Sequence, residues 1–563
     1  MGERFLQRLL ATVGQVHGKE GRTALLMFFY SFLAMMTWNV VKPVTRSKFI
    51  THLGAANLPY VQLAAGLLVG ILMAGYAWLV SRLPRRWCIP IVQAGIAALL
   101  VIFYFLFRTG EEWVSVAFYL YGNTMLGILL ISQFWTVANV VYDPRQAKRL
   151  FGFIGGGASL GGIAGSFVTD QLARPLGTNN LVLIAAGVML LCVTVVVLVV
   201  SRERIADDTM MAATEQEKGV GAKRALELLR QSKHLQMIAL VISFAAIGAA
   251  IIEQQFNMAL DASYGPDETN AITAILARVQ FWASVAGFGI QILLTSRIHR
   301  YLGIGFALLL LPFSLGTTAF IMLFNAAIWA PALARALDTS LRYTVDKTTR
   351  EILYMPLPAE MKFEAKPFVD VTVDRFAKGL GAVLLLFLIK PWGLALGWQQ
   401  VSYVSILITA IWIFVAFRAK LGYLAAFRHS IETQEMKPAE VRLAAADLST
   451  IETLLQELAS PDERRVVYAI DVLEALDRRH LITPLLLHHE SPAVRARALN
   501  LFGSMPAETA ARWLPAIQRM LGDESPEVRA AAVGALATIR DEKVTDLVRP
   551  LLQDNDVRIA MMA

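Results

Sequence analysis

The sequence predicts an all-α protein in two parts: a polytopic membrane body with twelve transmembrane helices, followed by a water-soluble α-solenoid. From about Thr23 to Phe417, the chain is a succession of apolar stretches near membrane-spanning length. From about Pro438 to Ala563, it is charged and repeats a short helical pattern. The composition agrees with a membrane body, because 56% apolar residues and a mean hydropathy of +0.53 exceed the values of ordinary soluble domains.

Six segments follow from this division. They are an N-terminal segment (1–22), a first group of six spans (23–200), a cytoplasmic loop (201–233), a second group of six spans (234–417), a linker (418–440) and the repeat domain (441–563). In the first segment, apolar residues from Phe5 to Val16 have helical spacing with arginines interleaved. We therefore expect an amphipathic helix on the inner membrane surface rather than a cleavable signal.

Twelve stretches are apolar and long enough to cross a bilayer as helices. Their approximate bounds are 24–41, 58–80, 87–107, 113–140, 150–171, 180–200, 234–257, 270–294, 301–324, 326–345, 366–390 and 395–417. The formal net charge of +8 lies largely in alternate loops, which contain Arg82, Arg149 and Arg297 among others. The opposite loops are acidic at Glu111 and Asp267. This asymmetry places both chain ends and the repeat domain in the cytoplasm.

The loop at 201–233 divides the spans into six and six. This outline resembles that of major facilitator transporters, which consist of two six-helix halves with a cleft between them. In such an arrangement, the first, fourth, seventh and tenth spans would line the cleft.

Ionisable residues are costly inside a membrane, so those within spans are candidates for a binding site. Charges fall in the first, seventh, tenth and eleventh spans, and an asparagine adds a polar group to the fourth. The candidate substrate-binding residues are Lys42, Arg46, Asn123, Glu253, Arg335, Asp338, Lys366, Asp370 and Lys378. We place Lys42 and Arg46 one helical turn apart at the outer end of the first span.

Two interpretations of these charges remain open. In the tenth and eleventh spans, residues of opposite charge recur at helical spacing, so they can also pair and hold helices together. Lys42 and Arg46 have no acid nearby in the sequence. We therefore expect their partner to be either a ligand anion or Glu253 across the cleft. Such side chains donate several hydrogen bonds to phosphate or carboxylate oxygens.

The fifth span contains a glycine-rich run from Gly155 to Gly165. It is not a phosphate-binding loop, because no Gly-Lys-Ser/Thr follows it and no strand precedes it. Gly157, Gly161 and Gly165 instead fall on one helix face. This spacing predicts close packing of two membrane helices.

The tail repeats a Ser-Pro-x-x-Arg pattern. Arginines recur at positions 464, 495, 529 and 558, shortly after Ser460, Ser491, Ser525 and Asn555, respectively. Each of these motifs opens a run of apolar residues at helical spacing. We expect Ser or Asn to cap each helix and Pro to occupy its first turn. The pattern resembles HEAT-type repeats, which usually bind protein, so we expect a cytosolic protein partner.

Several blocks resemble the ATP/ADP translocase family of plastids and intracellular bacteria. They are TREILYMPLP at 349–358, KPFVD at 366–370, RFAKG at 375–379, VKPVTR at 41–46, FWTVAN at 134–139 and AKRLF at 147–151. The resemblance implies nucleotide counter-exchange in a bacterial inner membrane. It also implies that Lys42 and Arg46 form the family's basic first-span motif, that Glu253 is its seventh-span acid and that Lys366 or Lys378 is its eleventh-span lysine. Asn123 departs from the pattern, because it stands where nucleotide carriers have a glutamate.

Three hypotheses follow. The first is a secondary transporter of an organic, phosphorylated anion, with the tail regulating it or binding a partner. The second is a carrier or flippase for a lipid or another amphipath, and the third is a membrane receptor or scaffold that presents the tail. We expect no enzymatic activity, no cofactor, no metal and no nucleic-acid partner. Cys88 and Cys192 lie inside apolar spans and match no metal or redox spacing.

Overall fold

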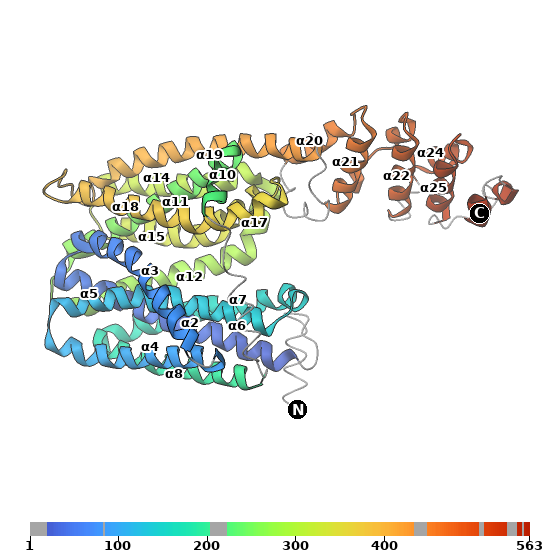
Figure 1. Ribbon diagram of the computed structural model, residues 1–563. Coiled ribbons are helices and arrows are strands. Elements are labelled where there is room, and N and C mark those ends of the chain that lie inside the picture. Colours follow the sequence, from blue (N-terminus) through green and yellow to red (C-terminus); the bar gives the residue numbers. More distant parts are fainter. Residues whose placement is uncertain are drawn as a thin grey trace.

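The computed structural model describes residues 20–82, 85–202, 222–432, 448–505, 512–537, 549–553 and 557–562. These residues form helices and turns without a strand, which confirms the all-α class. Nearly all of the predicted amphipathic segment 1–22 and most of the loop at 201–233 lie outside them. Figure 1 shows two layers of long helices, with the repeat domain extending from one end of the second layer.

The first helix group surrounds one apolar core, which contains Tyr30, Leu100, Phe118 and Met189. Its helices are α2 (Gly21–Leu53), α3 (Leu58–Arg82), α4 (Arg85–Leu106), α5 (Glu112–Tyr121), α6 (Leu130–Val141), α7 (Pro144–Leu176) and α8 (Thr178–Arg202). A π-helical segment, η4 (Gly122–Leu129), joins α5 to α6. Helix α2 packs against both α7 and α8 and so lies at the centre of this group.

The second helix group packs around a different core, which contains Ile238, Leu311 and Trp412. Its α-helices are α10 (Ala222–Gln231), α11 (Lys233–Ser263), α12 (Thr269–Gly289), α13 (Thr295–Arg297), α14 (Gly303–Phe324), α15 (Trp329–Leu341), α16 (Lys347–Leu353), α17 (Ala359–Pro367), α18 (Asp374–Ile389) and α19 (Val401–Glu432). The π-helical segments that extend them are η5 (Ile290–Leu294), η6 (Ile298–Leu302), η7 (Arg342–Asp346) and η8 (Phe368–Val373). Helix α12 packs against α7 and α2 of the first group and lies between the two layers (Figure 1).

Nine helical segments of the described chain are long and apolar enough to cross a membrane. One of them, Thr269–Phe324, includes both the eighth and the ninth predicted spans. The stretches at 326–345 and 366–390 are also largely helical but are not among the nine. They carry the charges of η7, α17 and η8, which lower their hydropathy. A membrane-spanning body is therefore confirmed, whereas the number of twelve spans stays a prediction.

Two predicted boundaries are wrong. The first span was expected to end at residue 41, but α2 continues through Pro43 to Leu53, so Lys42 and Arg46 lie inside a helix rather than at its outer end. The stretch 418–440 was expected to be a linker, but its described part, as far as Glu432, belongs to α19. Tyr423 and Phe427 are buried there, and their rings stack 6.0 Å apart.

One long helix of the membrane body, α19, therefore reaches the repeat domain. Helix α19 contacts the first two helices of the repeat domain, α20 (Leu448–Glu457) and α21 (Glu463–Ala475). The buried residues of the second helix group and of the repeat domain form one contiguous apolar cluster. This packing gives the two parts a shared core.

The glycines of the fifth span pack against a helix, as the sequence predicts. A methyl group on Gly157, Gly161 or Gly165 would overlap a main-chain carbonyl oxygen of α2. The carbonyls belong to Phe28, Phe32 and Met36. By contrast, a methyl group on Gly155 would meet no atom within 4 Å. The three glycines thus let the backbones of α7 and α2 approach each other closely.

The repeating arginines hold the turns of the tail. Arg495 in α22 (Pro492–Gly503) donates to the carbonyls of His489 and Glu490, six and five residues earlier. Arg529 in α25 (Pro526–Ala537) makes the same two contacts with Asp523 and Glu524. The remaining elements of the tail are η10 (Arg479–Leu481), η11 (Pro484–His488), α24 (Leu514–Arg519), η12 (Met520–Gly522), η13 (Arg549–Gln553) and α27 (Val557–Met562).

The predicted serine caps are wrong for two repeats. Helix α21 is capped by Asp462, whose carboxylate accepts from the Arg464 amide at 3.0 Å. Ser491 precedes α22, but its hydroxyl donates to Glu463 of the preceding repeat at 2.7 Å. The serine therefore links neighbouring repeats. Asn555 of the last repeat lies outside the described residues.

We predict that Gly161→Ala destabilises the membrane body, because the added methyl group would force α7 away from α2. The expected loss is about 1–3 kcal/mol, as for overpacking of other cores. Thermal unfolding of the detergent-solubilised protein measures it. Gly155→Ala is the matched control and should leave the melting temperature unchanged. Equal melting temperatures for both variants would contradict the proposed packing.

We also predict that Arg495→Ala loosens the repeat domain. Arg495 binds both carboxylate oxygens of Asp523 at 2.9 Å. Burial tends to raise the pKa of Asp523, but the hydrogen bonds from Arg495 and from the Ser525 amide hold it below its ordinary value. A lowered pKa stabilises the fold above the unfolded-state pKa of about 3.9, and this contribution is lost as the pH falls through the folded-state pKa.

Hydrogen exchange of α22 and α25 in the full chain measures this effect. At pH 7, Arg495→Ala should lower protection by the equivalent of about 2 kcal/mol. The difference from wild type should shrink in acid. Arg519→Ala, which removes an exposed arginine with one 3.3 Å contact to its own helix, is the control. Equal protection of the two variants at pH 7 would refute the role of Arg495.

Candidate functional site

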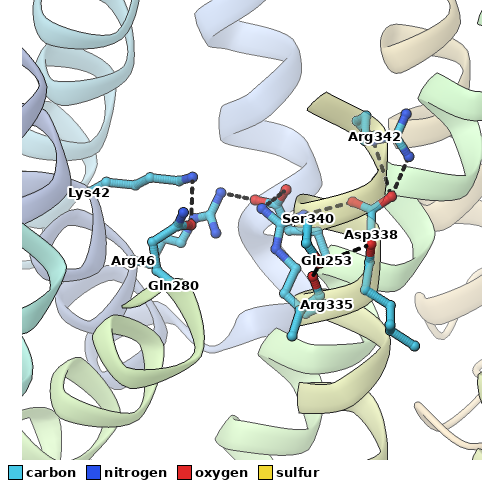
Figure 2. Close-up of polar contacts among 10 residues, drawn as sticks. Lys42, Arg46, Glu253, Gln280, Arg335, Asp338, Ser340 and Arg342 are labelled. Carbon is cyan, nitrogen blue, oxygen red and sulfur yellow. Dashed lines mark hydrogen bonds and ion pairs between the residues drawn. The ribbon is translucent and has the colours of Figure 1, made fainter. Parts of the chain in front are cut away.

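Charged side chains from the two helix groups meet deep between them (Figure 2). Helix α2 supplies Lys42 and Arg46, and α11 supplies Glu253. Helix α15 supplies Arg335 and Asp338, and η7 adds Arg342. We call these six residues the Glu253 cluster.

Glu253 lies at the centre of the cluster. One of its carboxylate oxygens is paired with Arg46, and the other lies 3.2 Å from Nη2 of Arg335. The three side chains are only 13%, 18% and 12% exposed, in the order Arg46, Glu253 and Arg335. Glu253 therefore connects an arginine of the first helix group with an arginine of the second.

Asp338 continues this chain of ion pairs along one helix face. Its carboxylate lies 3.2 Å from Arg335, which is three residues earlier in the chain. It is also paired with Arg342, which is four residues later. The Asp338 side chain is 2% exposed. This spacing places all three residues on the same side of the helix.

Lys42 is held more loosely. Its Nζ lies 3.4 Å from Oε1 of Gln280 on α12, which is near the limit for a hydrogen bond. The amide nitrogen of Gln280 donates to Ser284 at 3.2 Å, which leaves the oxygen facing Lys42. Lys42 is thus bound through one long contact with a neutral group.

A narrow cavity lies between these side chains. Its lining residues are Lys42, Pro43, Arg46, Phe256, Leu276, Val279, Gln280, Arg335 and Thr339. Its volume of about 20 Å³ is enough for about one water molecule. The side chains therefore largely fill the site in this structure.

The Glu253 cluster contains four cations, Lys42, Arg46, Arg335 and Arg342, and two acids, Glu253 and Asp338. Asp346 does not change this charge balance, because its negative charge is offset by Arg350, which lies 2.7 Å from it. The net formal charge of the cluster is therefore +2, and Lys42 is its one cation without a described acidic partner. A buried charge is costly unless it is paired, so this arrangement favours an anion.

The other predicted residues make local contacts. Asn123 donates to the Tyr119 carbonyl of its own helix at 3.0 Å. Lys366 pairs with Glu351, and Asp370 accepts from the Tyr354 hydroxyl at 2.9 Å. Lys378 is 57% exposed and pairs with Asp374 at 2.7 Å. The described contacts join none of these to Glu253, and the pair of Lys378 with Asp374 has the spacing expected for charges that pair along one span.

The sequence did not single out Gln280 and Thr339 as site residues. Both are neutral polar residues in predicted spans, where they stand out less than charges do. Gln280 nevertheless supplies the contact to Lys42, and Thr339 follows Asp338 directly. A search for amides in otherwise apolar spans would have found Gln280.

The two helix groups also meet on the Leu53 side of the site. Thr273 of α12 donates to Ser47 at 2.6 Å and lies 2.9 Å from the Thr178 hydroxyl. Gln254 donates to the Ala55 carbonyl at 2.7 Å, and Asp261 accepts from the Ala55 amide at 2.8 Å. These contacts form a largely buried polar seam between the groups.

Two family models match parts of this chain. The family model described as "TLC ATP/ADP transporter" matches residues 97–335 and 321–423, and a HEAT repeat model matches residues 480–563. Glu253, Arg335 and Asp338 fall inside the transporter match, whereas Lys42 and Arg46 precede it.

Among similar proteins, ADP,ATP carrier protein 3 of Rickettsia felis is 23% identical over 50% of this chain and 65% of its own length. ADP,ATP carrier protein 1 of Chlamydia pneumoniae is 23% identical over 58% of this chain and 70% of its own length. The chain thus spans about 65% of the length of the Rickettsia relative.

A solved structure, a bacterial homolog to the human lysosomal transporter Spinster in an inward-facing and unoccupied conformation, is 12% identical with a TM-score of 0.46. The match covers 73% of this chain and 99% of the chain in the solved structure. The transporter model alone matches more than half of the residues. This chain therefore belongs to the TLC ATP/ADP transporter family.

Proposed function

We propose that this protein is a secondary transporter of a nucleotide-like, phosphorylated anion. The observation that carries the proposal is the buried excess of positive charge around the cavity at Arg46 and Arg335. Arginine guanidinium groups bind phosphate oxygens through paired hydrogen bonds. Membership of the family and the carrier names of its Rickettsia and Chlamydia relatives support a nucleotide-type substrate.

In this proposal, the two helix groups are two six-helix halves that alternate around the Glu253 cluster. Lys42 and Arg46 hold the charge of the substrate, and Glu253 couples binding to the movement of the halves. The polar seam beyond Arg46 supports a state that is closed on the outer side of a bacterial inner membrane. With both chain ends in the cytoplasm, substrate would then enter from the inside.

The repeat domain would regulate this movement or dock a cytosolic protein. Support comes from α19, which runs from the membrane body into contact with α20 and α21. A continuous helix with a shared apolar core can pass a displacement from one part to the other. Coupling of this kind requires two conformational states, and both the membrane body and the repeat domain must shift the equilibrium between them.

A lipid or amphipath carrier is the second candidate. It is favoured by an apolar cavity of about 400 Å³ between α3, α4 and η4. The lining residues are Val69, Ile71, Leu72, Gly75, Tyr76, Val92, Thr124, Met125, Ile128 and Leu129. Such a cavity has the size and polarity of a site for an acyl chain.

We predict that neutralising Lys42 and Arg46 together, as Lys42→Gln with Arg46→Gln, abolishes nucleotide uptake by proteoliposomes. The substrate would lose both cations of the first half, which should lower uptake at least tenfold, about 1.4 kcal/mol. The control is Lys223→Gln with Arg230→Gln, which removes two exposed charges from α10. It should transport like wild type.

Lysophospholipids are tested beside ADP and other organic phosphates. Nucleotide uptake that survives the Lys42 and Arg46 change would contradict the proposed site. Transport of lysophospholipid alone would favour the second candidate. No transport of any compound by folded wild-type protein would leave a receptor or scaffold that presents the repeat domain.

A further inference from the structure

Glu253 occupies the position that a ligand anion would take. Its two carboxylate oxygens are directed at arginines from opposite helix groups, Arg46 and Arg335 (Figure 2). The adjoining cavity of about 20 Å³ is too small for a phosphate group beside the carboxylate. A phosphate that reaches both arginines must therefore displace the Glu253 side chain.

The charge balance sets the kind of ligand that can do so. With Glu253 in place, the cluster keeps two positive charges in excess of its acids. A ligand with two negative charges that displaces Glu253 from its two arginines, but not from the cluster, would neutralise this excess, whereas a ligand with a single charge would leave a net positive charge buried. The long 3.4 Å contact between Lys42 and neutral Gln280 leaves this lysine able to turn toward the ligand.

We propose that Glu253 is an internal counter-ion that competes with a dianionic phosphate monoester for Arg46 and Arg335. This inference rests on the proposed transport function and specifies the substrate class of the same site. Without ligand, the Glu253 carboxylate pairs with the two arginines; with ligand bound, the phosphate pairs with them instead.

Displacement also changes the contact between the helix groups. The ion pair between Arg46 and Glu253 joins α2 to α11, and a phosphate on Arg46 breaks it. A ligand shifts a conformational equilibrium only by its different affinity for the two states. Competition for Arg46 supplies such a difference, because the ligand binds at the expense of a contact between the groups.

The test is the affinity of the full-length protein for AMP at pH 8, where its phosphate carries two charges. Thermal stabilisation across an AMP titration measures the dissociation constant. Glu253→Gln removes the competing charge. The variant should melt at a lower temperature than wild type without ligand, because it loses both ion pairs, yet bind AMP at least tenfold more tightly.

Three controls accompany this variant. Asp170→Asn removes a different ion pair between the groups, in which Arg278 lies 3.1 Å from Asp170, and should leave AMP affinity unchanged. Glu253→Asp keeps the charge on a shorter side chain, so its affinity for AMP should lie between those of wild type and Glu253→Gln. This variant keeps the test informative if Glu253→Gln fails to fold. The methyl ester of AMP, which carries one phosphate charge, should bind at least tenfold more weakly than AMP.

The outcomes separate this inference from the proposed function. If Arg46→Gln abolishes AMP binding but Glu253→Gln leaves it unchanged or weakens it, the competition is refuted and the proposed site survives. Equal binding of AMP and its methyl ester would refute the requirement for a dianion. If AMP stabilises wild type and Arg46→Gln equally, or stabilises neither, the proposed site fails and the inference fails with it.

Discussion

The bridge from Arg46 through Glu253 to Arg335 is the interaction on which the rest of the site depends. Two charges 3.2 Å apart attract by about 5 kcal/mol at an effective dielectric constant of about 20. Burying the ions costs several kcal/mol each, so such a bridge contributes little net stability. Removing one of the three side chains is costly, however, because the remaining charges are then buried and unpaired. A bridge that is neutral when complete and costly when broken suits a site whose partners exchange.

The position of this bridge is set by packing elsewhere in the membrane body. Gly157, Gly161 and Gly165 fix α2 against α7, which sets the position of Arg46 within the first group. The seam from Ser47 to Thr273 holds α2 against α12 beyond the site, while Gln280 on the same α12 contacts Lys42. Hydroxyl and amide contacts of this kind exchange partners at low cost, because each contributes only about 1 kcal/mol. Beyond the site, these polar contacts lie beside an apolar cluster that both groups share, in which Phe49 and Leu58 pack with Leu260.

The sequence predicted the parts of the fold that follow from local pattern. Apolar stretches indicated the membrane body, and the recurring arginine indicated the repeats. Small residues on one face of the fifth span indicated that it packs closely against another helix, which the structure identifies as α2. It failed where a local feature resembled a boundary. The first span was expected to end at residue 41, but α2 continues to Leu53, and Arg46 is paired within the protein. In the tail, a serine before proline has the pattern of a cap, yet Ser491 bonds to the neighbouring repeat instead.

The candidate site could be predicted only in part for a related reason. Charges inside spans identified Arg46, Glu253 and Arg335 as unusual, but composition does not show which of them meet. Lys366, Asp370 and Lys378 were equally unusual, and the structure pairs them locally with Glu351, Tyr354 and Asp374. Gln280 carries no charge and gave no comparable signal. Contacts between distant segments decide these outcomes, and helical spacing reports only on neighbours within a segment.

In the proposed mechanism, a substrate phosphate takes the place of the Glu253 carboxylate between two arginines. The most direct measurement is a cryo-electron microscopy structure of the full-length protein in nanodiscs with ADP. We expect phosphate density between Arg46 and Arg335, with the Glu253 side chain turned away from both. Nucleotide density elsewhere, or between the arginines with Glu253 still bound to Arg46, would contradict it.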